Sequence, residues 1–96
     1  MLSEFSNEVL KLIGDWGNEA TLSLENIQSK DKGTKLCLCV KVSDMENVPV
    51  LTMEPYYKEY QEGRGIESIA YEIEDIVSNI VNDPFSLILK VLYFKI

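Results

Sequence analysis

Residues 47–69 read Asn-Val-Pro-Val-Leu-Thr-Met-Glu-Pro-Tyr-Tyr-Lys-Glu-Tyr-Gln-Glu-Gly-Arg-Gly-Ile-Glu-Ser-Ile, and this stretch carries the clearest structural signals in the chain. Val48 to Met53 predicts a strand, and Pro49 favours a sheet edge or a strand start because proline cannot donate a hydrogen bond to a neighbouring strand. Pro55 fits the first turn of a short aromatic helix, which Gly63 ends. The signature is structural and contains no chemical motif.

A second, longer helix is predicted directly after this stretch. Its apolar residues recur at helical spacing, with acidic and amide residues between them. The apolar stripe consists of Ile66, Ile69, Ala70, Ile73, Ile76, Val77, Ile80 and Val81. Pro84 ends the helix because it disfavours helical geometry at Asp83. Phe85 to Ile96 then predicts a last helix that belongs either to the core or to an interface.

The N-terminal half predicts one helix and a β-hairpin. Leu2 to Trp16 is amphipathic at helical spacing, and Gly17-Asn18 is a plausible left-handed stop. Ala20 to Ile27 and Leu36 to Val42 alternate with period two, as strands do, and the polar residues 29–33 join them in a turn.

The element order predicts one α+β domain over residues 1–96. We expect a three-stranded, mostly antiparallel sheet with an N-terminal helix and two to three C-terminal helices packed on one face.

Composition excludes several classes of function. The chain has 96 residues and a formal net charge of −7, which disfavours direct nucleic-acid binding because that affinity depends on lysine and arginine. It contains no histidine, so histidine-dependent catalysis is absent and we expect neither an enzyme nor a cofactor. Early acidic residues argue against a secretory signal, and no segment is apolar for the ~20 residues that span a bilayer. We therefore expect a cytoplasmic protein without membrane contact.

Residues 47–80 resemble an uncharacterised family from gut Firmicutes and their mobile elements, catalogued as domain of unknown function 5688. The shared pattern is carried by Asn47, Pro49, Tyr56, Tyr57, Tyr60, Gly63, Arg64, Ile69 and Ile73, and the match is looser over residues 24–42. The resemblance supports the fold and implies no reaction or ligand. Gly65 stands where the family usually has a serine that caps the Ile-rich helix. Relatives generally continue well past this helix, and their additional residues would cover the apolar segment from Phe85 to Ile96. We therefore expect this segment to be exposed here, which favours dimerisation or partner binding.

Three groups of residues are candidates for a metal or anion site, and each also has a structural explanation. Cys37 and Cys39 provide only two thiolates, so a zinc site needs a second chain, and reduced thiols are the simpler interpretation. Gly63-Arg64-Gly65 is more simply a helix break than an anion nest. The acids Glu67, Glu72, Glu74 and Asp75 share a helix face and fit either a divalent-cation site or the solvated side of an amphipathic helix.

The predicted contact surface is the tyrosine-rich, acidic region of the two helices. Tyr56 and Tyr60 are expected to stack one turn apart, whereas Tyr57 points elsewhere. Tyrosine and arginine are enriched at binding hot spots, so rings beside Arg64 are the best candidate patch; the alternative is that they cover the sheet edge. The complete set of candidate contact residues is Tyr56, Tyr57, Tyr60, Arg64, Glu67, Glu72, Glu74 and Asp75.

The charge distribution favours a basic protein partner. Residues 54–83 contain eight acidic residues against Lys58 and Arg64. The leading hypothesis is a non-enzymatic protein-binding module, a small acidic regulator or inhibitor. The alternative is a nucleic-acid mimic encoded by a mobile element, of the anti-CRISPR or anti-restriction type, and a hydrolase or metal enzyme ranks third.

Overall fold

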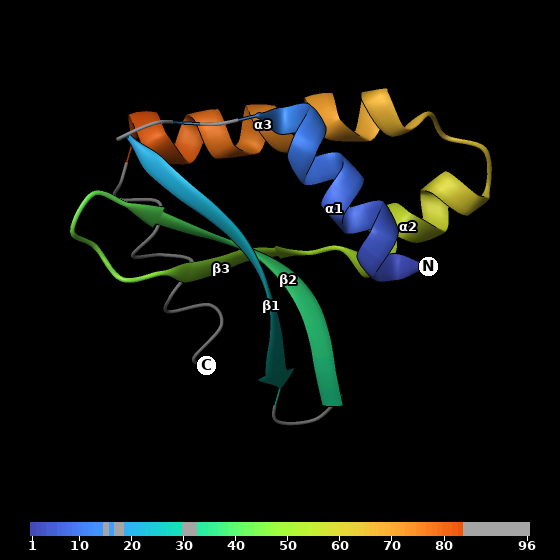
Figure 1. The fold of residues 1–96 in the computed structure, drawn as a ribbon, viewed down its shortest axis with the longest axis horizontal. Coiled ribbons are helices and arrows are strands. Elements are labelled where there is room, and N and C mark those ends of the chain that lie inside the picture. The colour runs from blue at the N-terminus through green and yellow to red at the C-terminus, as the bar shows by residue number, and fades with distance from the viewer. Residues whose placement is uncertain (15, 17–18, 30–32, 84–96) are drawn as a thin grey trace.

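The computed structural model describes residues 1–14, 16, 19–29 and 33–83 of the chain (Figure 1). The elements are α1 (Leu2–Ile13), β1 (Ala20–Ser29), β2 (Gly33–Val42), β3 (Val48–Thr52), α2 (Glu54–Gln61) and α3 (Ile66–Asn82). An N-terminal helix, a three-stranded antiparallel sheet and two C-terminal helices form an α+β fold, so the predicted fold class is confirmed.

The sheet has the order β1-β2-β3, and both strand pairs are antiparallel. β1 and β2 pair without interruption from Ala20 opposite Val42 to the far end of the hairpin. Between β2 and β3 the register shifts, which leaves Val50 as an extra residue on β3. Pro49 lies on β3, an edge strand, as its missing N–H group predicts.

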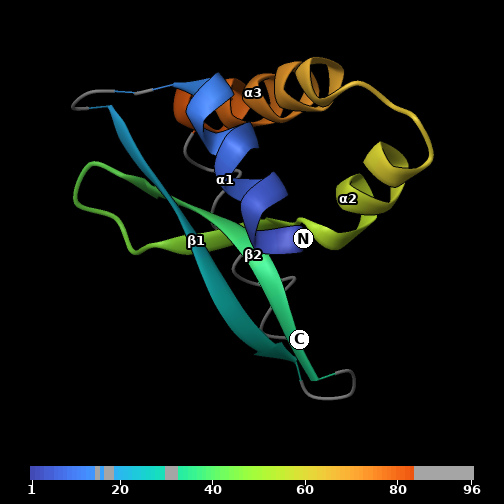
Figure 2. The same ribbon diagram turned by 45° about the vertical axis from the view of Figure 1, so that its right-hand side comes forward.

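The helices α1 and α3 cover one face of the sheet (Figures 1 and 2). α1 and α3 lie side by side over it, and α2 lies at one end of the sheet, next to the start of α1 (Figures 1 and 2). The core between these layers is aliphatic, with Val40, Ile69, Ile73 and Val77 all at 0% exposure. Each such side chain contributes roughly 1.5–3 kcal/mol by leaving water. This isoleucine-rich side of α3 is the stripe that the sequence predicts.

The first helix is shorter than predicted. α1 ends at Ile13 because Gly14 adopts a left-handed backbone with φ of +86°, and its N–H donates to the Leu10 carbonyl at 3.2 Å. Trp16 lies beyond the helix and still packs against the core. The predicted stop at Gly17-Asn18 lies outside the described residues.

The C-terminal boundary of α3 agrees with the sequence. The helix ends at Asn82, two residues before Pro84. The predicted last helix, Phe85 to Ile96, and the homodimer contact assigned to it lie outside the described residues. No helix within the described part of the chain is both long and apolar enough to cross a membrane.

Candidate functional site

A charged cluster centred on Arg64 holds α2 against α3. Gly63, with φ of +111°, turns the chain after α2, and Arg64 follows it in the link between the two helices. The guanidinium Nη1 lies 2.7 Å from Oε1 of Glu59 on α2, and Nη2 lies 2.9 Å from Oε1 of Glu72 on α3. Its Nε donates to the Ser68 hydroxyl at 3.2 Å. We call Arg64 and these three partners the Arg64 clamp.

Tyr56 on α2 adds a further contact to the clamp. Its hydroxyl donates to Oε2 of Glu72 at 2.8 Å, so both carboxylate oxygens of Glu72 accept hydrogen bonds. Burial, and then the hydrogen bond to Glu72, raise the pKa of Tyr56 to about 12. Hydrogen bonds from Tyr56 and Arg64 hold the pKa of Glu72 below its usual value. A general acid–base pair needs groups that exchange a proton readily near neutral pH. The shifts move the pKa values of Tyr56 and Glu72 away from neutral pH, so the arrangement suits a structural ion pair.

The other two predicted tyrosines pack on α1. Phe5 lies 5.3 Å from Tyr57 and 5.1 Å from Tyr60 between ring centroids. Tyr57 and Tyr60 are near parallel at 6.5 Å. The expected stacking of Tyr56 on Tyr60 is therefore replaced by a Tyr57–Tyr60 pair, because Tyr56 turns towards Glu72 on α3. The surface location expected for at least one ring fits Tyr60, whose residue is 43% exposed.

The predicted acids divide into two groups. Glu72 belongs to the clamp, whereas Glu67, Glu74 and Asp75 lie on the exposed side of α3. Between them lies Tyr71, which is 78% exposed and was not among the predicted contact residues. The sequence does contain a signal for it, because an aromatic residue occupies a polar position of an amphipathic helix.

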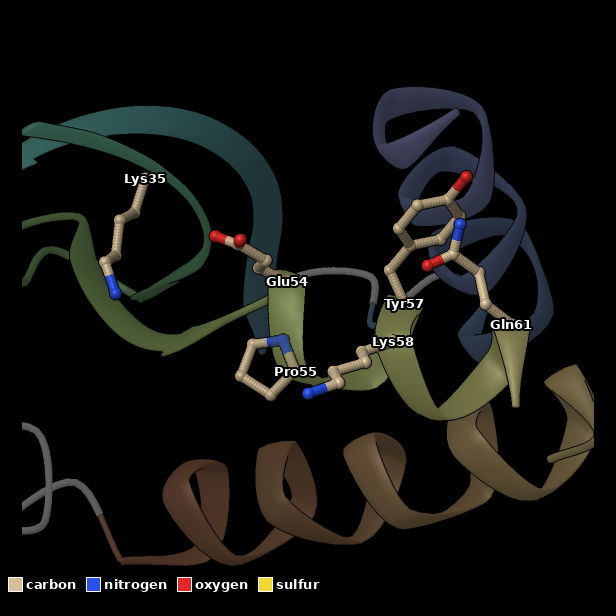
Figure 3. Close-up of a pocket in the computed structure, with 6 residues that line it drawn as sticks. All are labelled: Lys35, Glu54, Pro55, Tyr57, Lys58 and Gln61. Carbon is tan, nitrogen blue, oxygen red and sulfur yellow. The ribbon is translucent and has the colours of Figure 1, made fainter. Parts of the chain in front are cut away.

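Two pockets meet at Tyr57 and Gln61 of α2. The larger, of about 630 Å³, is lined by Lys35, Glu54, Pro55, Tyr57, Lys58 and Gln61. Figure 3 shows Lys35 arriving from β2 and Lys58 from α2, with Glu54 and Pro55 between them. The smaller pocket, of about 230 Å³, lies between α1 and α2 and adds Glu4, Phe5, Glu8 and Tyr60 to the shared pair.

The two cysteines are buried on the sheet face opposite α1 and α3, because they alternate along β2 with the core residues Leu38 and Val40. Cys37 and Cys39 are each 1% exposed and both are free thiols. Burial, and then the charge of Glu25 on β1, raise the pKa of Cys39 to about 12. Beside them Asn47 donates hydrogen bonds to Ser23 and to Glu25. No group of three or more histidine, cysteine or acidic residues in the described ranges is placed to hold a metal ion.

Comparison with known proteins adds no relative. A scan against protein-family models, a search of curated proteins and a search of solved structures each gave no match. A function therefore has to be inferred from the side chains of the chain itself.

Proposed function

We propose that the chain is a non-enzymatic protein-binding module, a small acidic regulator or inhibitor that contacts a basic partner protein through the outer face of α3. The observation that carries this proposal is Tyr71, which is 78% exposed. Glu67, Glu74 and Asp75 lie three or four residues from Tyr71 and are exposed as well. Residues at this spacing are neighbours on a helix surface, so the ring is surrounded by carboxylates.

An exposed tyrosine among acids combines two properties of interface residues. The ring provides a large contact area with only two rotatable side-chain bonds, and tyrosine is enriched at binding hot spots. The surrounding carboxylates attract a basic surface and reject an acidic one, so they contribute mainly to association rate and partner choice. Compared with the set expected from the sequence, this contact surface keeps Glu67, Glu74 and Asp75 and adds Tyr71. It leaves out Tyr56, Tyr57, Tyr60, Arg64 and Glu72. Arg64 is already occupied by the clamp.

Photo-crosslinking from α3 tests the proposal. A benzoylphenylalanine at position 71 should capture a discrete basic protein in a lysate of the native host, and the same group at Asp44, an exposed position between β2 and β3, should not. With the captured protein purified, Tyr71→Ala should weaken binding by a factor of about 10 or more. Glu46→Gln, which removes an exposed acid between β2 and β3, is the matched control and should leave binding unchanged. Equal capture from both positions would contradict the proposal.

The same purified pair distinguishes a nucleic-acid mimic from the protein-binding module. A mimic presents carboxylates in place of phosphates, so neutralising Glu67, Glu74 and Asp75 should abolish its binding while Tyr71→Ala should have little effect. Its binding should also weaken steeply with added salt, as phosphate recognition does. Loss of binding in Tyr71→Ala favours the module.

A further inference from the structure

The smaller of the two pockets has an aromatic floor and an acidic edge. We call it the aromatic pocket and define it by Phe5, Tyr57 and Tyr60, with Glu4 and Glu8 at its edge. The three ring centroids lie within 5.1–6.5 Å of one another. Phe5 is buried at 4% exposure, whereas Tyr60 is 43% exposed, so the cluster is open to solvent on the tyrosine side.

The electrostatics of the aromatic pocket favour a cation. Aromatic faces carry partial negative charge and attract ammonium or guanidinium groups within about 6 Å. Glu4 and Glu8 are one helical turn apart on α1, so both carboxylates lie beside the rings. Glu8 also pairs with Lys11 at 3.7 Å, but both side chains are more than half exposed and such a pair is weak. Among the described residues that line this pocket, Met1 carries the α-amino group, and none is a lysine or an arginine.

We propose that the aromatic pocket binds the ammonium group of a lysine side chain from the partner protein. This inference rests on the proposed function as a protein-binding module and adds the chemistry of the contacting residue. A cavity of about 230 Å³ is large enough for an ammonium group and its alkyl stem. A lysine ammonium is a compact point charge on a flexible four-carbon stem, so it can approach the rings and both carboxylates without the fixed orientation that the planar guanidinium fork requires.

The neighbouring pocket defines the direction in which a lysine can approach. It shares Tyr57 and Gln61 with the aromatic pocket, but Lys35 and Lys58 line its far side. These two lysines outnumber Glu54 there and repel a cation, so of the two adjoining pockets only the aromatic pocket is favourable for an ammonium group. The charge difference between the two pockets also provides a matched pair of variants for the test.

Proton NMR titration of the full chain with Nα-acetyl-lysine methylamide tests the assignment. We expect a saturable shift of the Phe5, Tyr57 and Tyr60 ring resonances, with a dissociation constant on the order of 10 mM. The ε-methylene protons of the ligand should move upfield through the ring currents. The Nε-trimethylated analogue should bind as well or better, because it keeps the positive charge, and the Nε-acetylated analogue should not bind.

Substitutions then assign the contacts. Glu4→Gln with Glu8→Gln should weaken lysine binding by a factor of about 3–10, and Tyr60→Leu by a factor of about 2–5. Lys58→Gln, in the larger neighbouring pocket, should leave lysine binding unchanged or make it slightly tighter. Tyr71→Leu is the matched control for an exposed tyrosine and should have no effect. Amide spectra of each variant establish that it is folded.

Several outcomes would overturn the proposal. These are no saturable shift up to about 0.1 M ligand, equal binding of the neutral acetylated analogue, tighter binding of the arginine analogue, or full affinity in folded Tyr60→Leu. If the parent protein does not bind the lysine analogue but the group at position 71 still captures a partner, the aromatic-pocket proposal is rejected and the proposed function stands. Lysine binding without any Tyr71-dependent partner would reject the α3 contact surface instead.

Discussion

Replacing Tyr56 by phenylalanine removes one hydroxyl and tests how α2 is attached to α3. The hydroxyl donates to Glu72 at 2.8 Å, and the Glu72 side chain is 46% exposed. A hydrogen bond contributes about 0.5–1.5 kcal/mol net, and more to a charged acceptor, but solvent screens this one. We therefore expect Tyr56→Phe to lower the free energy of unfolding by about 1 kcal/mol near neutral pH, which is a fall in Tm of about 4–8 °C.

At alkaline pH the stabilities of the parent protein and of Tyr56→Phe should be in the reverse order. The pKa of Tyr56 rises from an ordinary value of 10.0 to about 12 in the folded chain. The folded state therefore keeps a proton that the unfolded state loses, so stability is complete below pH 10 and falls as the pH rises towards 12. A full shift of two pKa units corresponds to about 2.7 kcal/mol, and the loss should be smaller than this because solvent screens the partly exposed Tyr56–Glu72 pair. Tyr56→Phe cannot lose this contribution and should become the more stable protein.

Urea denaturation near neutral pH, at pH 10 and at pH 12 measures both effects. Tyr71→Phe makes the same chemical change on an exposed ring and should stay within about 0.5 kcal/mol of the parent near neutral pH. Acid pH provides a second test. The pKa of Glu72 is lowered in the folded chain, so the stabilisation that the Glu72 carboxylate provides is lost as the pH falls below the ordinary pKa of 4.5. Equal stability of parent and Tyr56→Phe near neutral pH, or a difference that stays constant between pH 10 and 12, would refute the reasoning.

Three further changes examine the core, a helix cap and the buried thiols. Ile73→Ala, at 0% exposure, should lower the free energy of unfolding by about 2–5 kcal/mol in urea, whereas Leu12→Ala, at 47% exposure, should cost far less. Gly65→Ser should stabilise by a few tenths of a kcal/mol in the same assay, because Gly65 caps α3 without a side-chain acceptor and its extended backbone accepts serine. Cys37 and Cys39, each 1% exposed, should react with iodoacetamide only as the chain unfolds, and rapid labelling of the folded protein would contradict their placement.

Local sequence patterns predict most of the fold, because they record which side of each element leaves water. The isoleucine stripe of α3 and the alternation in β2 both appear as expected, and Pro49 lies on an edge strand. The end of α1 was wrong by three residues, since Gly14 and Gly17 are both suitable stops and periodicity alone does not choose between them. Local periodicity also does not decide whether Cys37 and Cys39 lie in the core or on the sheet surface, because the burial of a strand residue depends on residues that are distant in sequence.

The candidate site was harder to predict because its contacts join residues that are far apart in sequence. Arg64 was predicted as a contact residue from its type and its neighbours, but its partner Glu72 is eight positions away and across a helix break. The pairing depends on the angle between α2 and α3. The turn at Gly63 sets this angle, and helical periodicity does not encode it. Tyr71 shows the opposite case: its exposure follows directly from the helical pattern, because it occupies one of the polar positions of α3.

The aromatic pocket depends on the clamp, whereas the contact surface around Tyr71 does not. Arg64 fixes α2 relative to α3, and α2 carries Tyr57 and Tyr60 against Phe5 of α1. If the clamp opens, we expect α2 to shift and the rings of the aromatic pocket to separate, and we expect Tyr71 on the outer face of α3 to stay in place. Arg64→Gln should therefore weaken lysine binding in the aromatic pocket without changing crosslinking from position 71. A loss of both in the folded variant would mean that the two surfaces form one contact, and a loss of neither would show that the clamp does not position the rings.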